Sequence, residues 1–383
     1  MSCVRRFAGI RAFLALVLLL PPSFSEAAVD CATPGRDGSG SLSGVVNTYW
    51  PGTATAAAGA NSITLGAARG APAAQTPIAS GDLLLVIQMQ DAAINSTNTD
   101  SYGDGAAGGS ASGWTSPNNS GKYEYVKATG ALPVAGGVLT IQGTGAGSGL
   151  LNTYTNADAT ATQGQRRFQV VRVPQYSSAT LTSGLTAAAW NGATGGVLAI
   201  DVSGALDLAA ATVSVDGLGF RGGGARQVSG DTGGADTDYV QSSAKNFDGA
   251  KGEGAAGTPN WIYDVGSGTT ISSGTDYPNN NTTIDGGLAR GAPGNAGGGG
   301  TDGRPSNNDR NSGGGGGGNG GAGGHGGFTW NTELDRGGYG GVAFTAAATA
   351  VVLGGGGGAG TRNNSAGAVS SGAAGGGIVM FRV

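Results

Sequence analysis

The sequence predicts a mainly β protein with a β-sandwich-like core. A glycine-rich bundle of polyglycine II helices is expected to be interleaved with this core or to follow it. Between residues 43 and 216 the apolar runs are short and end at Gly, Pro, Asn or Ser, as β-strands do. Glycine accounts for 80 of 383 residues, and 51 of these follow residue 216. We therefore expect a β-rich domain at 29–216 and a glycine-rich domain at 217–383, in which apolar strands return.

Residues 1–28 have the pattern of a secretory signal peptide. Arg5, Arg6 and Arg11 precede the apolar run 12–20, and small residues follow it at 25–28. The run is too short to cross a bilayer as a helix. No later segment approaches 18 apolar residues, so we expect a soluble mature chain without a transmembrane segment. The predicted location is extracellular or at the cell surface.

Seven strands are predicted in the first domain. Leu83 to Ile87 is continuously apolar, which indicates a central strand buried on both faces. A single helical turn is predicted at 185–190. The expected strands are 43–49, 83–90, 122–128, 137–142, 167–173, 196–202 and 211–216.

Apolar segments also interrupt the glycine-rich half, at 342–344, 350–353 and 378–383. Residues 376–383 repeat the pattern of residues 195–202: two glycines, four apolar residues, one charged residue and valine. A flexible tail has no need of such a strand. The repeat therefore indicates one interleaved structure.

The tract at 313–327 is glycine at twelve of fifteen positions, with Asn319, Ala322 and His325 at every third residue. A polyglycine II helix has three residues per turn and no internal hydrogen bonds, so it packs by lateral backbone bonds. Two of its edges must then be glycine, and the third can carry side chains. Disorder as a flexible spacer is the alternative for this region.

Four side chains are candidates for display to a partner. Tyr102 and Trp114 lie in the long polar loop 91–121, and loops of this kind often carry binding residues. Asn319 and His325 would stand on the exposed edge of the glycine tract.

Catalytic and metal-binding patterns are sparse. His325 is the single histidine, and there is no G-x-S-x-G motif, so neither a zinc site of the usual kind nor a hydrolase triad is predicted. Asp236 and Asp238, with Asp231 nearby, are weak candidates for calcium, and no other cofactor is expected. Charged residues make up 11% of the chain and the net charge is −4, which disfavours nucleic-acid binding.

Three stretches, 31–53, 81–105 and 195–223, resemble the N-terminal module of glycine-rich bacterial secreted and cell-surface proteins, a largely uncharacterised group. The resemblance implies location and architecture and no catalytic residues. We therefore expect a non-catalytic surface protein with a structural or adhesive role, whose partners are glycans or other surface proteins. Two alternatives are a carbohydrate-active enzyme on a β-helix-like scaffold and a polyglycine II protein that orders ice or water.

Overall fold

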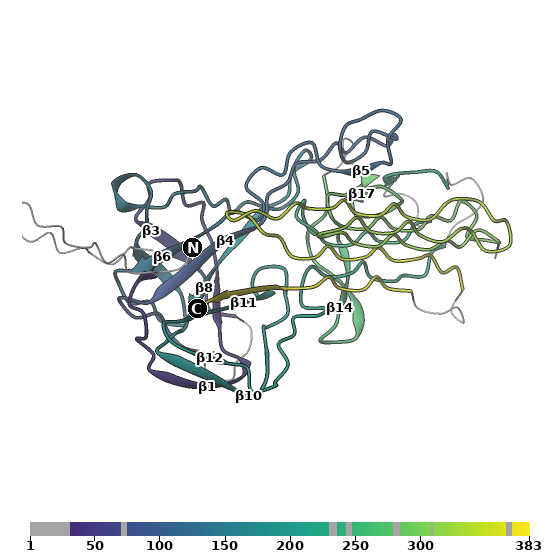
Figure 1. Ribbon diagram of the computed structural model, residues 1–383. Coiled ribbons are helices and arrows are strands. Elements are labelled where there is room, and N and C mark those ends of the chain that lie inside the picture. The colour runs from purple at the N-terminus through teal and green to yellow at the C-terminus, as the bar shows by residue number, and fades with distance from the viewer. Residues whose placement is uncertain are drawn as a thin grey trace, which may run out of the picture.

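The computed structural model describes residues 31–69, 75–229, 236–242, 247–278, 284–307, 309–364 and 370–383. The predicted signal peptide, 1–28, lies outside these ranges. The protein is mainly β with almost no helix, which confirms the predicted fold class at that level. The larger strands gather at one end of the molecule, and glycine-rich segments run as extended chains at the other (Figure 1).

The largest sheet has six antiparallel strands. Their order is β2 (Thr48–Pro51), β8 (Arg167–Val173), β4 (Leu83–Gln90), β6 (Tyr123–Ala128), β7 (Gly137–Gln142) and β3 (Ser62–Leu65).

Strand β4 lies inside this sheet, and all of its residues are buried, as predicted. Its side chains alternate between two apolar cores. Leu83, Leu85 and Ile87 belong to one core, and Leu84 and Val86 belong to the other. A strand covered on both faces needs apolar residues at every position, which explains the continuous run.

Two smaller sheets are parallel. One contains β1 (Ser39–Val45), β10 (Ser178–Thr186) and β12 (Leu206–Asp207). The other contains β18 (Ile378–Arg382), β11 (Val197–Val202) and β9 (Gln175–Tyr176). The side chains of β11 also alternate: Val197 and Ala199 join the core beneath the six-stranded sheet, whereas Leu198 and Ile200 join a third core with β10.

The two similar segments found in the sequence lie side by side. β18 pairs with β11 in parallel, from Val197 opposite Ile378 to Asp201 opposite Arg382. The charged residues of the two repeats form an ion pair, with 3.6 Å between Arg382 Nε and Asp201 Oδ1. The end of the glycine-rich half thus completes a sheet of the first half, and the two halves are interleaved.

Several predictions for single elements are wrong. The segment 43–49 is divided between β1 and β2, because the Asn47 side chain bonds the backbone of Ala199 instead of pairing within a strand. In 211–216 only Val213 forms a bridge, to Leu185, and 185–190 begins inside β10 instead of forming a helical turn. Segment 342–344 contains no strand, and in 350–353 only Ala350 forms isolated bridges, to Lys122 and Ala347.

The remaining elements are short and come from both halves of the chain. β14 (Trp261–Asp264) and β15 (Thr269–Ser272) form a hairpin. The others are two-residue strands and one turn of 3₁₀ helix: β5 (Ser112–Gly113) with β17 (Ala292–Pro293), β13 (Gln241–Ser242) with β16 (Ile284–Asp285), and η2 (Ala146–Ser148).

The segment 354–361 shows how the glycine-rich chains are joined. Its N–H groups bond three neighbours in rotation, so that each neighbour is met again three residues later. Gly354, Gly357 and Gly360 donate to segment 370–376, which crosses in the opposite direction. Gly355, Gly358 and Thr361 donate to segment 312–318, and Gly356 and Ala359 donate to segment 250–253. All of these N···O distances are 2.7–3.0 Å.

Two more segments donate to the carbonyl groups of 354–361, through Gly297 and Gly300 and through Phe220 and Gly223. Five segments of the polypeptide are therefore bonded to segment 354–361 through backbone hydrogen bonds. A Cβ atom at Gly358 would lie 1.9 Å from the carbonyl oxygen of Gly298, so the packing leaves no room for a side chain there.

The tract 313–327 differs from the single three-edged helix that we predicted. It folds back on itself at 319–321. Gly313 and Gly316 donate to Gly327 and Gly324 across the resulting hairpin. Folding back lets the two arms satisfy each other's backbone groups, which one straight helix at the surface could not do. Across the described ranges no helix is long and apolar enough to span a membrane.

Candidate functional site

Of the two aromatic residues predicted for display in loop 91–121, one is buried and the other is half-buried. Tyr102 is fully buried, with Lys251 Nζ 4.1 Å from its ring centroid, so its predicted display role is wrong. Trp114 is half-buried and packs edge-on against Phe344, with 6.1 Å between ring centroids. The loop packs onto the glycine-rich half through the β5–β17 pairing, which encloses these rings.

Asn319 and His325 are exposed, but they do not share one helical edge. Asn319 lies at the hairpin turn, where its N–H donates to Gly321 O. His325 lies on the returning arm against the Tyr339 ring, with Nε2 3.4 Å from Asp335 Oδ1. No third group completes a hydrolytic arrangement among the described contacts of His325.

The two calcium candidates within the described residues have different partners. Asp231 lies outside the described residues. The two carboxylate oxygens of Asp236 are ion-paired with Arg336, at 3.0 Å, and Arg310, at 2.6 Å. Asp238 accepts a hydrogen bond from Asn98. Two guanidinium groups on Asp236 occupy the positions that a cation would need, and the described ranges hold no cluster of three His, Cys, Asp or Glu ligands.

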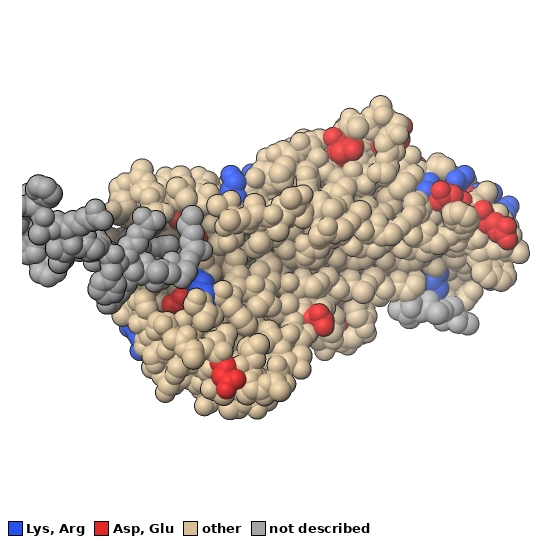
Figure 2. Space-filling view, viewed as in Figure 1, with Lys and Arg blue, Asp and Glu red and all other residues tan. Residues whose placement is uncertain are grey.

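Charged side chains are otherwise scarce on the face shown in Figure 2. Blue and red atoms gather at the end of the bundle away from the strands, in contrast to the largely uncharged surface between. The ion pair between Arg304 and Asp309 lies in the same loop as Arg310, which is paired with Asp236.

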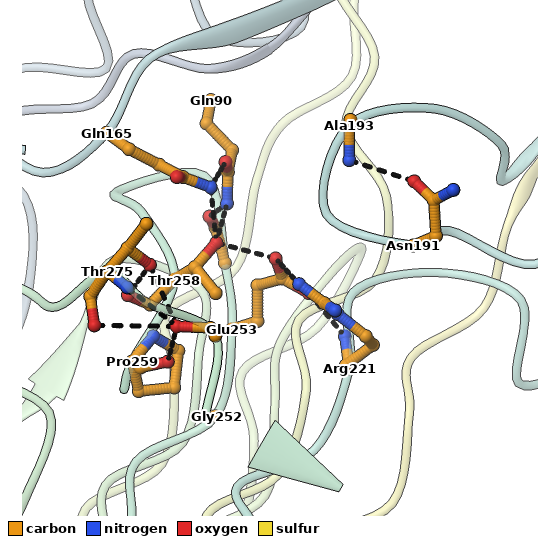
Figure 3. Close-up of polar contacts among 12 residues, drawn as sticks. Gln90, Gln165, Asn191, Ala193, Arg221, Gly252, Glu253, Thr258, Pro259 and Thr275 are labelled. Atoms are coloured by element: carbon orange, nitrogen blue, oxygen red, sulfur yellow. Dashed lines mark hydrogen bonds and ion pairs between the residues drawn. The ribbon is translucent and has the colours of Figure 1, made fainter. Parts of the chain in front are cut away.

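A buried polar network joins the two halves (Figure 3). Glu253, fully buried, accepts hydrogen bonds from Arg221 Nε at 2.7 Å and Nη2 at 2.8 Å, and from Thr258 Oγ1 at 2.6 Å. Thr258 Oγ1 in turn accepts from the amides of Gln90 and Gln165, at 3.1 and 2.7 Å. Gln90 ends β4 and Gln165 precedes β8, so the network fixes the glycine-rich chains to the large sheet.

The charge state of this network follows from its pairing. Burial alone would raise the pKa of Glu253, but the Arg221 guanidinium and the hydrogen bonds around the carboxylate hold that pKa below its ordinary value. Burial likewise opposes the charge of Arg221, and Glu253 reverses the effect so that the pKa of Arg221 is raised. The pair is therefore ionised and inaccessible, which is a structural role.

Asp248 is a second buried acid, and it lacks such a partner. The residue is 1% exposed, and its carboxylate lies near the backbone N–H of Asp302 without the guanidinium contact that Glu253 has. Burial, followed by the nearby Asp238 charge, raises its pKa well above the ordinary value. Burial of this carboxyl therefore disfavours its charged form, and the arrangement around it does not form a site.

A shallow groove of about 490 Å³ lies on the glycine-rich half. Two exposed aromatic rings flank it, Phe328 at 63% and Trp330 at 60% exposure. The rest of the lining is small and polar: Asn311, Ser312, Thr361, Ser370, Ser371 and the backbone of Gly313, Gly314, Gly358 and Gly360. None of these lining residues, all within the described ranges, carries a charge.

Sequence reasoning missed both Phe328 and Trp330. Their signal was two aromatic residues at alternate positions in a polar stretch directly after the glycine tract. It also missed Glu253, whose signal was a lone acid between glycines.

No family model, no curated protein and no solved structure matches this chain.

Proposed function

We propose that this is a secreted surface protein with a structural or adhesive role and no catalytic activity, in which a β-sandwich-like core carries a bundle of polyglycine II helices. The observation that carries the proposal is the rotation of lateral hydrogen bonds around segment 354–361. A helix with three residues per turn directs successive N–H groups about 120° apart, so each neighbour is bonded at every third residue.

Such a bundle is rigid without a hydrophobic core. Ordering a glycine backbone costs about 1–2 kcal/mol per residue. Each lateral N–H···O bond returns about 0.5–1.5 kcal/mol, and close Cα–H···O contacts add smaller amounts. The balance requires dense pairing of backbone groups. In segment 354–361 every N–H group donates a backbone hydrogen bond, and the carbonyl groups of Gly354, Gly356, Gly357 and Ala359 accept one.

The adhesive part of the proposal is supported by what the bundle presents. Its inner segments consist mostly of glycine backbone, whereas the loop after the glycine tract carries the two exposed aromatic side chains of the groove, Phe328 and Trp330. A stiff frame holds such loops in place and lowers the entropy lost on binding.

The test combines rigidity and adhesion on the same preparation. Amide exchange of the full chain, with glycine labelled selectively, should show slow exchange at Gly315, Gly355 and Gly358. The same preparation, coated on beads, should bind at least one member of a panel of surface glycans and matrix proteins, without degrading it. Fast exchange of these glycine amides would refute the proposed rigid bundle. Degradation of a bound polysaccharide would favour the alternative of a carbohydrate-active enzyme.

A further inference from the structure

We propose that the groove beside Trp330 is a binding site for a neutral oligosaccharide. The inference rests on the proposed adhesive role and gives that role a ligand class. A ring of sugar C–H groups packs flat on an aromatic face, while sugar hydroxyls need neutral donors and acceptors nearby. Both kinds of contact are present: two exposed rings, and a lining of hydroxyl, amide and backbone groups without charge.

The loop that carries Trp330 is held in place on both sides of the exposed ring. The N–H of Trp330 donates to Asn311 O at 2.8 Å. Thr329, which is buried, bonds Thr332 through its hydroxyl at 2.7 Å and receives the N–H of Leu334 at 2.8 Å. A rigid aromatic anchor loses little conformational entropy on binding, so the exposed indole is positioned as a platform.

The lateral bonding of segment 313–318 leaves the backbone groups of Gly314 open at this groove. In segment 313–318, Gly313 and Gly316 bond the returning hairpin arm, and Gly315 and Gly318 bond segment 295–298. Among the described backbone hydrogen bonds, neither Gly314 nor Gly317 takes part. Gly314 lines the groove, so its N–H and C=O are directional partners for sugar hydroxyls.

Size and charge define the ligand further. A volume of about 490 Å³ lies within the range of about 300–1,000 Å³ that is common for small-ligand pockets, and the groove is open enough to admit a chain end or an internal stretch. A lining without Lys or Arg offers no counter-charge to a uronate or sulfate. We therefore expect neutral sugars to bind and acidic sugars to bind no better.

The test uses maltotriose, cellotriose and triacetylchitotriose as neutral probes, with trigalacturonate as the acidic probe. Binding to the full chain is measured by saturation-transfer NMR and by the shift of the Trp330 indole N–H, assigned with Trp330→Phe. We expect at least one neutral probe to bind, Trp330→Ala to weaken it at least about tenfold, and Trp330→Phe to retain most of the affinity. Val265→Ala, an exposed apolar residue on the β14–β15 turn, is the control and should have no effect.

Glycine amide exchange on the same samples separates the two proposals. Protected glycines without binding of any neutral trisaccharide would overturn the groove assignment and leave the rigid bundle standing. Tighter binding of trigalacturonate, or binding that survives Trp330→Ala, would also overturn it. Displacement of the bound sugar by a glycine-rich peptide, with higher affinity for the peptide, would reassign the groove to a protein ligand. Unprotected glycines would instead refute the bundle itself.

Discussion

Replacing Gly358 by alanine tests the backbone packing directly. The new Cβ would lie 1.9 Å from Gly298 O, whereas an ordinary carbon–oxygen contact is about 3.3 Å or longer. The chains must therefore separate by about 1.4 Å. That movement stretches the two bonds that join these segments, Gly297 N–H to Gly356 O and Gly300 N–H to Ala359 O, both 2.9 Å long. It also displaces Gly358 from Gly315 O, to which its N–H donates at 2.8 Å. At about 0.5–1.5 kcal/mol each, the expected loss is about 3 kcal/mol.

Gly357→Ala is a matched control one residue away. A Cβ at Gly357 meets its nearest neighbour, Ala373 N, at 3.5 Å, which is an ordinary contact. Alanine also reduces the freedom of the unfolded chain, so this variant should be neutral or up to about 1 kcal/mol more stable. Urea denaturation of both variants, with exchange of labelled glycine amides, measures the difference. Equal stability of the two variants would refute the close-packed arrangement of backbones.

Three further predictions concern buried groups. Glu253→Ala leaves Arg221 buried without its partner and should cost about 3–5 kcal/mol in urea denaturation, whereas Asp158→Asn, which breaks the exposed pair with Arg167, should have no measurable effect. Asp248→Asn should raise the free energy of unfolding at pH 7, since it removes an unpaired buried carboxyl; a loss of stability would reveal a partner for that carboxylate. Burial raises the pKa of Asp302 from 3.8 to about 6, so the folded state binds this proton more tightly than the unfolded state, and the contribution of Asp302 to stability should fall as pH rises through that window. Asp302→Asn should reduce the dependence of the unfolding free energy on pH between these values. An unchanged pH dependence would contradict the burial of this carboxyl.

The sequence indicated most of the large sheet because its signals are local. Strand β4 was predicted at its observed bounds, since burial on both faces requires a continuous apolar run. Strand β3 was missed because it has only four residues, too few for its alternation of polar and apolar side chains to stand out. Strand β10 was missed because most of its residues are Ser, Thr or Gly, which are typical of loops. Their strand conformation comes from pairing with β7 and β1.

The candidate site was harder to predict because exposure is a property of the assembled chain. Tyr102 and Trp330 are both aromatic residues in polar loops, and nothing in their neighbouring residues separates them. Tyr102 is enclosed by Lys251 and Gly291, about 150 and 190 residues later in the chain, whereas Trp330 stands at the edge of the bundle.

The amino-acid order by itself determined the β class, the concentration of glycine after residue 216 and the likeness of the segments that become β11 and β18. These are properties of composition and short-range pattern. Only the tertiary structure decided that the tract 313–327 folds back, that the halves share a sheet, and which chains lie against segment 354–361. Glycine runs carry no side chains to specify partners, so their neighbours are selected by the backbone bonds that the whole assembly can satisfy.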